Sequence, residues 1–534
     1  MIDIHFVIIG MKSDKKERIN MGLSKYREQF KTSMITAFIM IFCVHGYRFL
    51  NLLNSHDSML NIIQDDVYWQ RSLGRFMQPL VMALRGSVCA PWLLCLCSAI
   101  FMGISVFLVS IILQIKEKSV LLMLAGIMIS NVVMTAAYAA YLPWVDVYAI
   151  ALFLSLLGVL LCNQKSLMLN TCGCMCMAFS MGFYQAYICV AIGMMMILSL
   201  ICLQNEEQWR DSLKKIVRFV ICLAIAGGVY YLISQIVCTL HHVTPSNTYN
   251  GLNSIGDFSN VSIIDLIIGA YKEFFAFLRY PNTFSSIILM NIKVMDAWEI
   301  LLFCMNIVVC IIIVLGIIRH NILKKSKWWN FLLQMLIIIL FPLGVNFVYV
   351  MSKGMEHMLM IYAFILLYVL AFVVVRANIA ILPEKKIAKS YGYILLIPIL
   401  LLVWNNLVFS NQIYYKVHLQ QESVQSTMTK ILYEIEHMES YEYGATPVAF
   451  VGNLNNSDYV MNPEYFSDLS VIGVGISPIS YSGVEASYLK YYLNNKINVV
   501  NISPSVDEVA KMPNYPAKGS ICEIDGVIVV KFSD

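Results

Sequence analysis

Residues 298–318 read WEILLFCMNIVVCIIIVLGII, an apolar run that contains a single charged side chain. A helix rises about 1.5 Å per residue, so this run is long enough to cross the roughly 30 Å hydrocarbon core of a bilayer. Ten similar runs lie near 33–53, 91–114, 119–138, 146–162, 167–183, 185–203, 216–238, 329–350, 357–376 and 391–410. The sequence therefore predicts an α-helical polytopic membrane protein with about 11 transmembrane helices.

The composition of the 534-residue chain supports this fold class. Hydrophobic residues make up 59% of the chain and charged residues only 13%, against roughly 25% charged residues in soluble proteins. A water-soluble enzyme and a disordered chain are both excluded. The 15 cysteines lie almost wholly in apolar runs, and only Cys522 lies in the polar tail, so we expect no disulfide framework.

The charges predict an orientation. With the N-terminal segment 1–32 in the cytoplasm, the inner segments collect 22 lysines and arginines, and the outer loops before residue 411 keep about eight. Basic residues near helix ends resist translocation. We therefore expect the N-terminus inside and residues 411–534 outside. Those tail residues hold 7 basic and 14 acidic side chains, and the rest of the chain holds 30 and 19; this distribution argues against nucleic-acid binding.

The chain divides into the short segment 1–32, a multi-span domain at 33–410 and a tail at 411–534. The opening MIDIHFVIIG is too short to span a membrane and lacks a cleavage site, so it is not a signal peptide. Two outer loops, at 54–90 and 239–297, exceed the usual 2–8 residues of a helix–helix link. Long loops on a rigid scaffold commonly carry function.

The tail is predicted to form an extracytoplasmic α/β domain. Apolar residues from Val424 to Met438 recur at helical spacing, which indicates an amphipathic helix after the last span. The segments 447–452 and 497–503 are typical of buried strands, and two more strands flank the hairpin signal Asp525-Gly526.

The first long loop holds the main candidate site, in SHDSMLNIIQDDVYWQRSLGRFMQPLVMALRG (55–86). Asp65 and Asp66 are adjacent, so on a helix they would point about 100° apart and do different jobs. Residues 67–84 are amphipathic and suited to the interface, which would hold the acids at a fixed depth. Arg71 and Arg75 follow, and arginine binds phosphate through bidentate bonds. Two solvated loop acids are the alternative interpretation.

Three further groups of residues are candidate sites. Asp146 lies near a membrane boundary, where an acid is either functional or an ordinary start of a helix. The adjacent His241 and His242 lack metal-ligand spacing and favour a surface loop. Cys172, Cys174 and Cys176 alternate in an apolar run without CxxC spacing, so we expect buried apolar thiols and no metal site.

The stretch DDVYWQRSLGRFMQPLVMAL (65–84) resembles the first-loop signature of the GtrII-type membrane glucosyltransferases. Further resemblances follow in the same order along the chain: Asp146 in YLPWVDVY, Tyr184-Gln185-Ala186 in GFYQAYICVA, Asn411 to Tyr415 with Ser426, and Met512-Pro513, Tyr515-Pro516 and Gly519 in the tail. In the late outer loop MSKGMEHMLM (351–360), relatives carry an arginine, whereas this chain offers Lys353 and His357.

The resemblance implies a GT-C-like fold and a sugar transfer from a polyprenyl-phosphate carrier. Asp65 or Asp66 would be the general base, with Asp65 favoured, and the reaction would invert the anomeric centre. The candidate donor phosphate ligands are Arg71, Arg75, Lys353 and His357. Asp146, Tyr184 and Gln185 would contact substrate. No cofactor is firmly implied, although the class admits a divalent cation.

The resemblance also implies the partners and the location. The donor would be an undecaprenyl-phosphate hexose, glucose being expected, and the acceptor a bacterial cell-envelope polysaccharide such as an O-antigen. The protein would lie in the cytoplasmic (inner) membrane and depend on a carrier-charging enzyme and a flippase. Two alternatives share its length and loops: a polysaccharide polymerase, which would rely on arginine-rich outer loops, and a lipid-linked-sugar flippase, which would show internal repeats or broken helices.

Overall fold

The computed structural model describes most of the chain. The described residues are 15–55, 57–58, 67–86, 89–205, 209–247, 261–279, 297–381, 385–452, 454, 469, 471–474, 484–502 and 507–533. Asp65 and Asp66, the predicted catalytic pair, lie outside this part of the chain.

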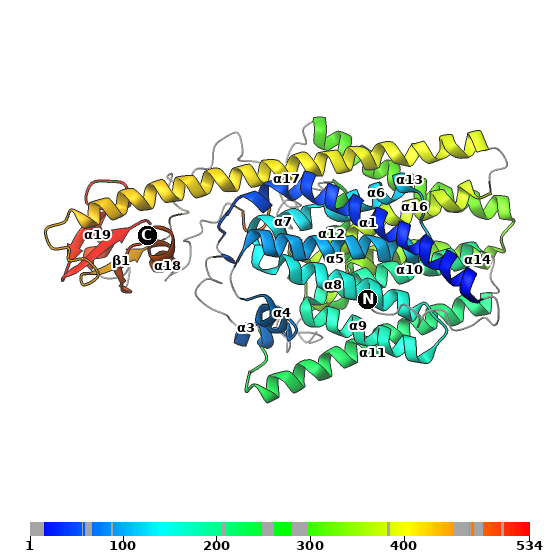
Figure 1. The fold of residues 1–534 in the computed structure, drawn as a ribbon, viewed down its shortest axis with the longest axis horizontal. Helices are drawn as coiled ribbons and strands as arrows, with labels where there is room; N and C mark the ends of the chain where they lie inside the picture. The colour runs from blue at the N-terminus through cyan, green and yellow to red at the C-terminus, as the bar shows by residue number, and fades with distance from the viewer. Residues whose placement is uncertain are drawn as a thin grey trace.

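Helices dominate the described residues and form an elongated bundle with a small sheet beyond one end (Figure 1). The first half of the bundle consists of α1 (Lys15–Leu50), α3 (Val67–Ser72), α4 (Gln78–Arg85), α5 (Pro91–Ile112), α6 (Lys118–Ile129), α7 (Val132–Ala140), η2 (Leu142–Trp144), α8 (Val145–Cys162), α9 (Leu167–Phe183), η3 (Gln185–Tyr187) and α10 (Ile188–Gln204). The second half consists of α11 (Trp209–Leu240), α12 (Ile263–Arg279), α13 (Ala297–Lys324), α14 (Trp328–Val345), α15 (Phe347–Met351), η5 (Met358–Met360), η6 (Tyr362–Ile365), α16 (Leu366–Ile379) and α17 (Lys385–Glu436).

The described part of the chain holds fewer candidate spans than the sequence predicts for the whole chain. Nine helices of the described part are long and apolar enough to cross a membrane, or up to ten when the bent pair α6 and α7 counts as one. The pair bends by 53°, and the Asn131 side chain caps α7 by accepting a hydrogen bond from the Met134 N–H at 3.1 Å. The predicted span 167–183 forms α9, a shorter apolar helix. The expected number of eleven is therefore not confirmed.

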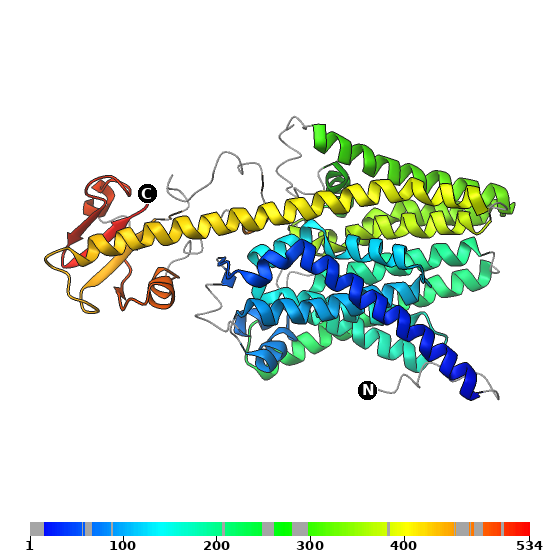
Figure 2. The ribbon, with the colours of Figure 1, turned by 45° about the horizontal axis from the view of Figure 1, so that its top comes forward.

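Helix α17 joins the bundle to the tail. Its 52 residues form one helix about 78 Å long, so it extends well beyond the span of a bilayer, as Figure 2 shows. The amphipathic helix predicted after the last span is the far end of α17. There Val424, Met428, Ile431 and Ile435 are buried against the tail.

The tail contains a four-stranded sheet in the order β2-β1-β4-β3. Its strands are β1 (Pro447–Val451), β2 (Asn498–Val499), β3 (Ile521–Ile524) and β4 (Val527–Lys531). Strand β1 pairs in parallel with β2 and β4, and β3 pairs antiparallel with β4. Asp525 and Gly526 turn the hairpin with positive φ, as predicted. Two short helices, α18 (Val484–Tyr492) and α19 (Asp507–Lys511), complete the tail.

The tail touches the end of the bundle at which α1 finishes. The Tyr492 hydroxyl donates to the Asn54 side-chain oxygen at 2.6 Å, and the Asn54 N–H donates to Gln421 of α17 at 2.7 Å. In the same region the fully buried Arg48 donates to the carbonyls of Tyr138 and Leu53. The entry into the first long loop is therefore tied to both the bundle and the tail.

Candidate active site at one end of the bundle

The chain between α3 and α4 is docked on the end of α9 by backbone contacts. The Met77 N–H donates to the Gly182 carbonyl at 3.0 Å, and the Gln78 amide donates to the Phe183 carbonyl at 2.8 Å. The Phe76 ring lies so close to Gly182 that a Cβ there would come within 2.5 Å of it. These contacts fix the position of the intervening Arg75.

Arg75 lies in a cluster with two residues from distant segments. Its guanidinium carbon lies 5.0 Å from the centre of the Tyr184 ring, within cation–π range. The Tyr184 hydroxyl lies 3.4 Å from Nε2 of His357. The Nε of Arg75 is buried and has no hydrogen-bond partner among the described residues. An arginine N–H in this state is suited to an anionic ligand, because guanidinium binds phosphate and carboxylate oxygens well.

Asp57 is a carboxyl of this site that the sequence analysis did not single out. Burial raises its pKa to about 6, although the positive charge of Arg75 and a hydrogen bond from the Trp144 side chain both lower it. The group thus titrates near neutral pH and acts electrostatically on Arg75. It precedes the Asp65-Asp66 pair in the same loop, but a single acid after Ser-His gives no sequence signal of burial.

His357 is uncharged at neutral pH in this setting. Burial and then the nearby positive charge of Arg75 lower its pKa to about 4. Its Nδ1 is buried and has no hydrogen-bond partner among the described residues. The imidazole can therefore offer a hydrogen bond to a ligand but adds no positive charge for a phosphate.

A second buried acid lies beside His357 in the chain. Both carboxyl oxygens of Glu356 are buried, with the Asn346 side chain near the carboxyl. Burial, together with the nearby Glu273 carboxyl of α12, raises the pKa of Glu356 well above its ordinary range. Both glutamates are thus more often protonated than surface acids, and sequence reasoning missed them because burial brings together segments more than 80 positions apart.

Asp146 forms a buried ion pair with Arg85. The Arg85 Nε lies 2.6 Å from a carboxyl oxygen of Asp146, and the side chains are 9% and 1% exposed. The other Asp146 oxygen accepts from the Val147 N–H at 2.9 Å, and Arg85 also donates to the Pro143 carbonyl. This pair ties α4 to the start of α8, next to the Trp144 that contacts Asp57.

The remaining predicted residues lie around the cluster. The Gln185 amide donates to the Leu73 carbonyl and, at 2.9 Å, to the Tyr230 hydroxyl, so it supports the docked chain. The half-buried Arg71 contributes its carbonyl, which accepts from the Cys238 thiol and the Gly74 N–H. Lys353 occupies a turn with a φ of 55° in the loop that leads to His357. His241 and His242 are exposed at the end of α11, as a surface loop requires.

One end of the bundle thus gathers Arg75, Tyr184 and His357, which the sequence predicted, with Asp57, which it did not. The fold and this cluster define a polytopic membrane protein with a charged, partly buried site at one end of its helix bundle. Within the described part of the chain, no His, Asp or Glu group at this site has metal-ligand spacing.

A family model described as Glucosyl transferase GtrII matches residues 46–376. The chain belongs to this family, and it is accordingly a membrane glycosyltransferase, as the motif resemblance predicted. Asp57, Arg75, Tyr184 and His357 all lie within the matched segment. No curated protein and no solved structure matches the chain.

Proposed function

We propose that this enzyme transfers a hexose, with glucose expected, from a polyprenyl-phosphate carrier to a cell-envelope polysaccharide. The observation that carries the donor class is the buried Nε of Arg75, which has no hydrogen-bond partner in the described part of the chain and is held against Tyr184 at one end of the bundle. A lipid phosphate brings an anion to this depth, and the surrounding apolar helices suit a polyprenyl chain.

The proposed reaction is an inverting displacement. Asp65 or Asp66, Asp65 being favoured, removes the proton of an acceptor hydroxyl, whose oxygen attacks the anomeric carbon. The bond to the carrier phosphate breaks, and its electron pair leaves with the phosphate. A positioned base typically contributes 10²–10⁴-fold to such a step. Arg75, with Arg71 and Lys353, stabilises the negative charge of the leaving phosphate.

The other site residues hold this geometry. Neutral His357 donates or accepts a hydrogen bond at the donor, and Tyr184 presents its ring and hydroxyl between Arg75 and His357. Asp146 and Gln185 border the substrate and keep the docked chain in place. No metal is required by this proposal.

We further propose that the site faces the outside of a bacterial cytoplasmic membrane, with the N-terminus inside and the tail domain outside. The acidic tail would contact the acceptor polysaccharide. A carrier-charging enzyme and a flippase would supply the lipid-linked sugar on this face.

The double variant Asp65→Asn with Asp66→Asn tests the reaction. In membranes supplied with radiolabelled polyprenyl-phosphate-glucose and acceptor, we expect transfer to fall at least about 100-fold, because the base is lost. A matched control is Asp211→Asn with Asp265→Asn, which changes two exposed acids outside the site and should leave transfer unchanged.

Full transfer by the Asp65/Asp66 double variant would overturn the proposed mechanism. The same assay separates the alternatives. A flippase would move the intact lipid-linked sugar across vesicles without cleaving it. A polymerase would join repeat units and would not consume the monosaccharide donor.

A further inference from the structure

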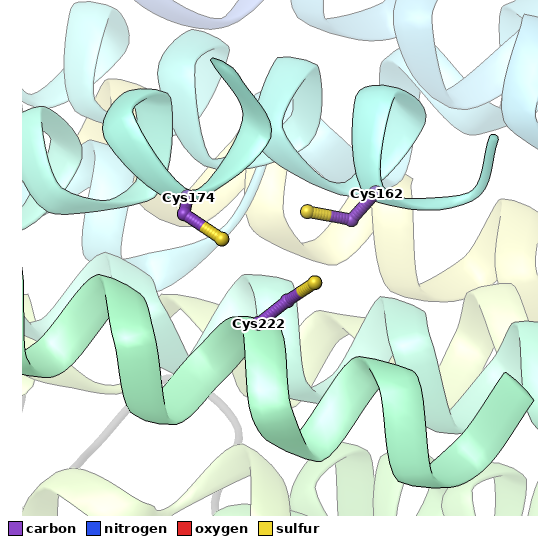
Figure 3. Close-up of side chains that lie close together, drawn as sticks. All are labelled: Cys162, Cys174 and Cys222. Carbon is purple, nitrogen blue, oxygen red and sulfur yellow. The ribbon is translucent and has the colours of Figure 1, made fainter. Parts of the chain in front are cut away.

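Three cysteine side chains converge at the end of the bundle opposite the Arg75 cluster. Cys162 is the last residue of α8, Cys174 lies in α9 and Cys222 in α11, and their sulfur atoms all lie within 4.8 Å of one another. Figure 3 shows the three thiols pointing toward one shared space. Among the described residues this is the one such group of potential metal ligands. We call it the thiol cluster.

Close packing of α8 on α9 holds the Cys162 thiol in place. Gly158 and Gly173 face each other so closely that a Cβ on Gly173 would lie 2.5 Å from the Cys162 sulfur and 2.8 Å from the Gly158 carbonyl oxygen. The Cys162 thiol also donates to the Asn170 carbonyl at 3.7 Å. The Cys162 sulfur is therefore held at the shared space.

The thiol cluster can be reached from outside the bundle. A groove of about 560 Å³ between α9 and α11 is lined by both Cys174 and Cys222. Although these two residues are only 3% and 4% exposed, the groove gives a small ion a path to them. An entry path is one of the requirements for a genuine metal site.

A positive charge lines the groove that leads to the thiols. Arg218 lies one helical turn before Cys222, lines the same groove, and has a buried Nε without a hydrogen-bond partner among the described residues. Lys214, one turn earlier again, also lines the groove but is exposed and pairs with Asp211 at 3.5 Å. Because a buried charged donor needs a partner, the Arg218 guanidinium suits a negatively charged group at the cluster, such as a set of thiolates.

We propose that the thiol cluster binds one soft monovalent d¹⁰ metal ion, Cu(I), through the sulfur atoms of Cys162, Cys174 and Cys222. Thiolates select soft ions, and three ligands leave Zn²⁺, which takes four, incompletely coordinated. With a metal–sulfur bond of about 2.3 Å, sulfurs in a trigonal arrangement stand roughly 4 Å apart, so the observed cluster needs only a small contraction.

Binding exchanges protons for the metal. Three thiols lose three protons to solvent as three sulfur–metal bonds form, and the resulting centre carries two negative charges next to the groove that Arg218 lines. No electron is transferred. The site joins three helices about 24 Å along α8 from Asp146, so it is separate from the sugar-transfer site and independent of the proposed reaction.

Titration of the full-length protein in detergent with Cu(I), under anaerobic conditions and against a Cu(I) chelator, tests the proposal. We expect one tightly held Cu(I) per chain. X-ray absorption should show three sulfur neighbours at about 2.3 Å. In the wild-type protein, Cu(I) should also protect Cys174 and Cys222 from alkylation, as read by mass spectrometry. This measurement needs no variant and therefore does not depend on a variant being able to fold.

The matched variants separate the cluster from the chain's other thiols. Replacing Cys162, Cys174 and Cys222 by alanine should lower the affinity at least about 100-fold, beyond the 10–100-fold typical of an outer-shell change. Replacing Cys172, Cys176 and Cys304, which lie outside the cluster, should leave it unchanged. Retained tight binding by the cluster variant, no protection of the wild-type thiols, or zinc held in preference to Cu(I) would overturn the proposal.

Discussion

At the scale of single residues, Arg75 decides how the site treats an anion. It lies over the Tyr184 ring and keeps one buried N–H without a partner among the described residues. A lysine in its place would keep the charge but lose the planar fork and the stacking on the ring. The side chain's shape is therefore expected to matter as much as its charge.

We expect Arg75→Lys to lower kcat/KM for the polyprenyl-phosphate sugar by about 10–100-fold, equivalent to roughly 1.4–2.7 kcal/mol of lost transition-state stabilisation. Arg75→Gln should lower it further. Steady-state kinetics in membranes, with donor concentration varied, measure both. Arg71→Lys serves as the comparison: the described contacts of Arg71 use its carbonyl, so we expect a smaller loss there, and an equal loss would contradict the leading role of Arg75 among the phosphate ligands.

The pKa of Asp57, raised to about 6 mainly by burial, gives a pH prediction. Above pH 6 the carboxylate is charged and competes with the donor phosphate for Arg75, and below pH 6 it is neutral. The donor KM should therefore rise as pH increases from 5 to 7, by about fivefold for a competition of about 1 kcal/mol. In Asp57→Asn the donor KM should stay constant over this range. A wild-type KM independent of pH would contradict the role of Asp57.

The site residues were only partly predictable from sequence. Arg75 is marked as a candidate by its chemistry in the first long loop, and Tyr184 and His357 by the resemblance to the family, but nothing in the sequence says that the three meet. Asp57 and Glu356 gain their character from burial, which depends on helices distant in the chain. The sequence predicts that Cys172, Cys174 and Cys176 are buried thiols of one helix, but Cys172 is exposed. The partners of Cys174 come from two other helices.

At the scale of elements, the sequence predicts that the amphipathic segment 67–84 holds Asp65 and Asp66 at a fixed depth in the membrane. The structure shows contacts that anchor part of this segment. Two backbone-directed hydrogen bonds and the Phe76–Gly182 contact hold its middle, and the Arg85–Asp146 pair holds its end. The helix boundaries were less predictable. The break between α6 and α7 at Ser130 and Asn131 depends on a side-chain cap. A single capping residue within an otherwise apolar run does not predict such a break.

Removing one partner of the buried Arg85–Asp146 ion pair is expected to destabilise the protein more than removing both. Arg85→Leu leaves the Asp146 carboxylate buried without its partner, which costs about 3–5 kcal/mol, whereas replacing both by leucine is often close to neutral. Thermal unfolding in detergent should therefore give a lower midpoint for the single variant than for the double variant. If the double variant is as unstable as the single one, the pair is not what anchors α4.

The same two variants report on Asp146 as a substrate contact. Once stability is restored in the double variant, any remaining loss of sugar transfer arises from the missing carboxylate at the site. We expect transfer to remain lowered, with a raised acceptor or donor KM. Full transfer would show that Asp146 only positions α4.

At the scale of the whole molecule, the tail and the site must lie on the same side of the membrane. The Tyr492–Asn54 and Asn54–Gln421 hydrogen bonds join the tail, the first long loop and α17 at one end of the bundle. The opposite end carries basic residues of the inner segments, among them Lys165, Arg210 and Arg319. The charge asymmetry that predicts the outer position of the tail therefore predicts the outer position of Arg75 as well.

Labelling of single introduced cysteines in intact cells tests this orientation. Lys518→Cys lies on the exposed surface of the tail, and Lys165→Cys is exposed in the turn between α8 and α9. A maleimide that cannot cross the membrane should label Lys518→Cys in intact cells and label Lys165→Cys only after the cells are opened, against a background measured on the wild-type protein. The reverse pattern would put the tail inside. Because the contacts of Asn54 tie tail and site to one end, it would place Arg75 on the cytoplasmic face and exclude transfer to an envelope polysaccharide.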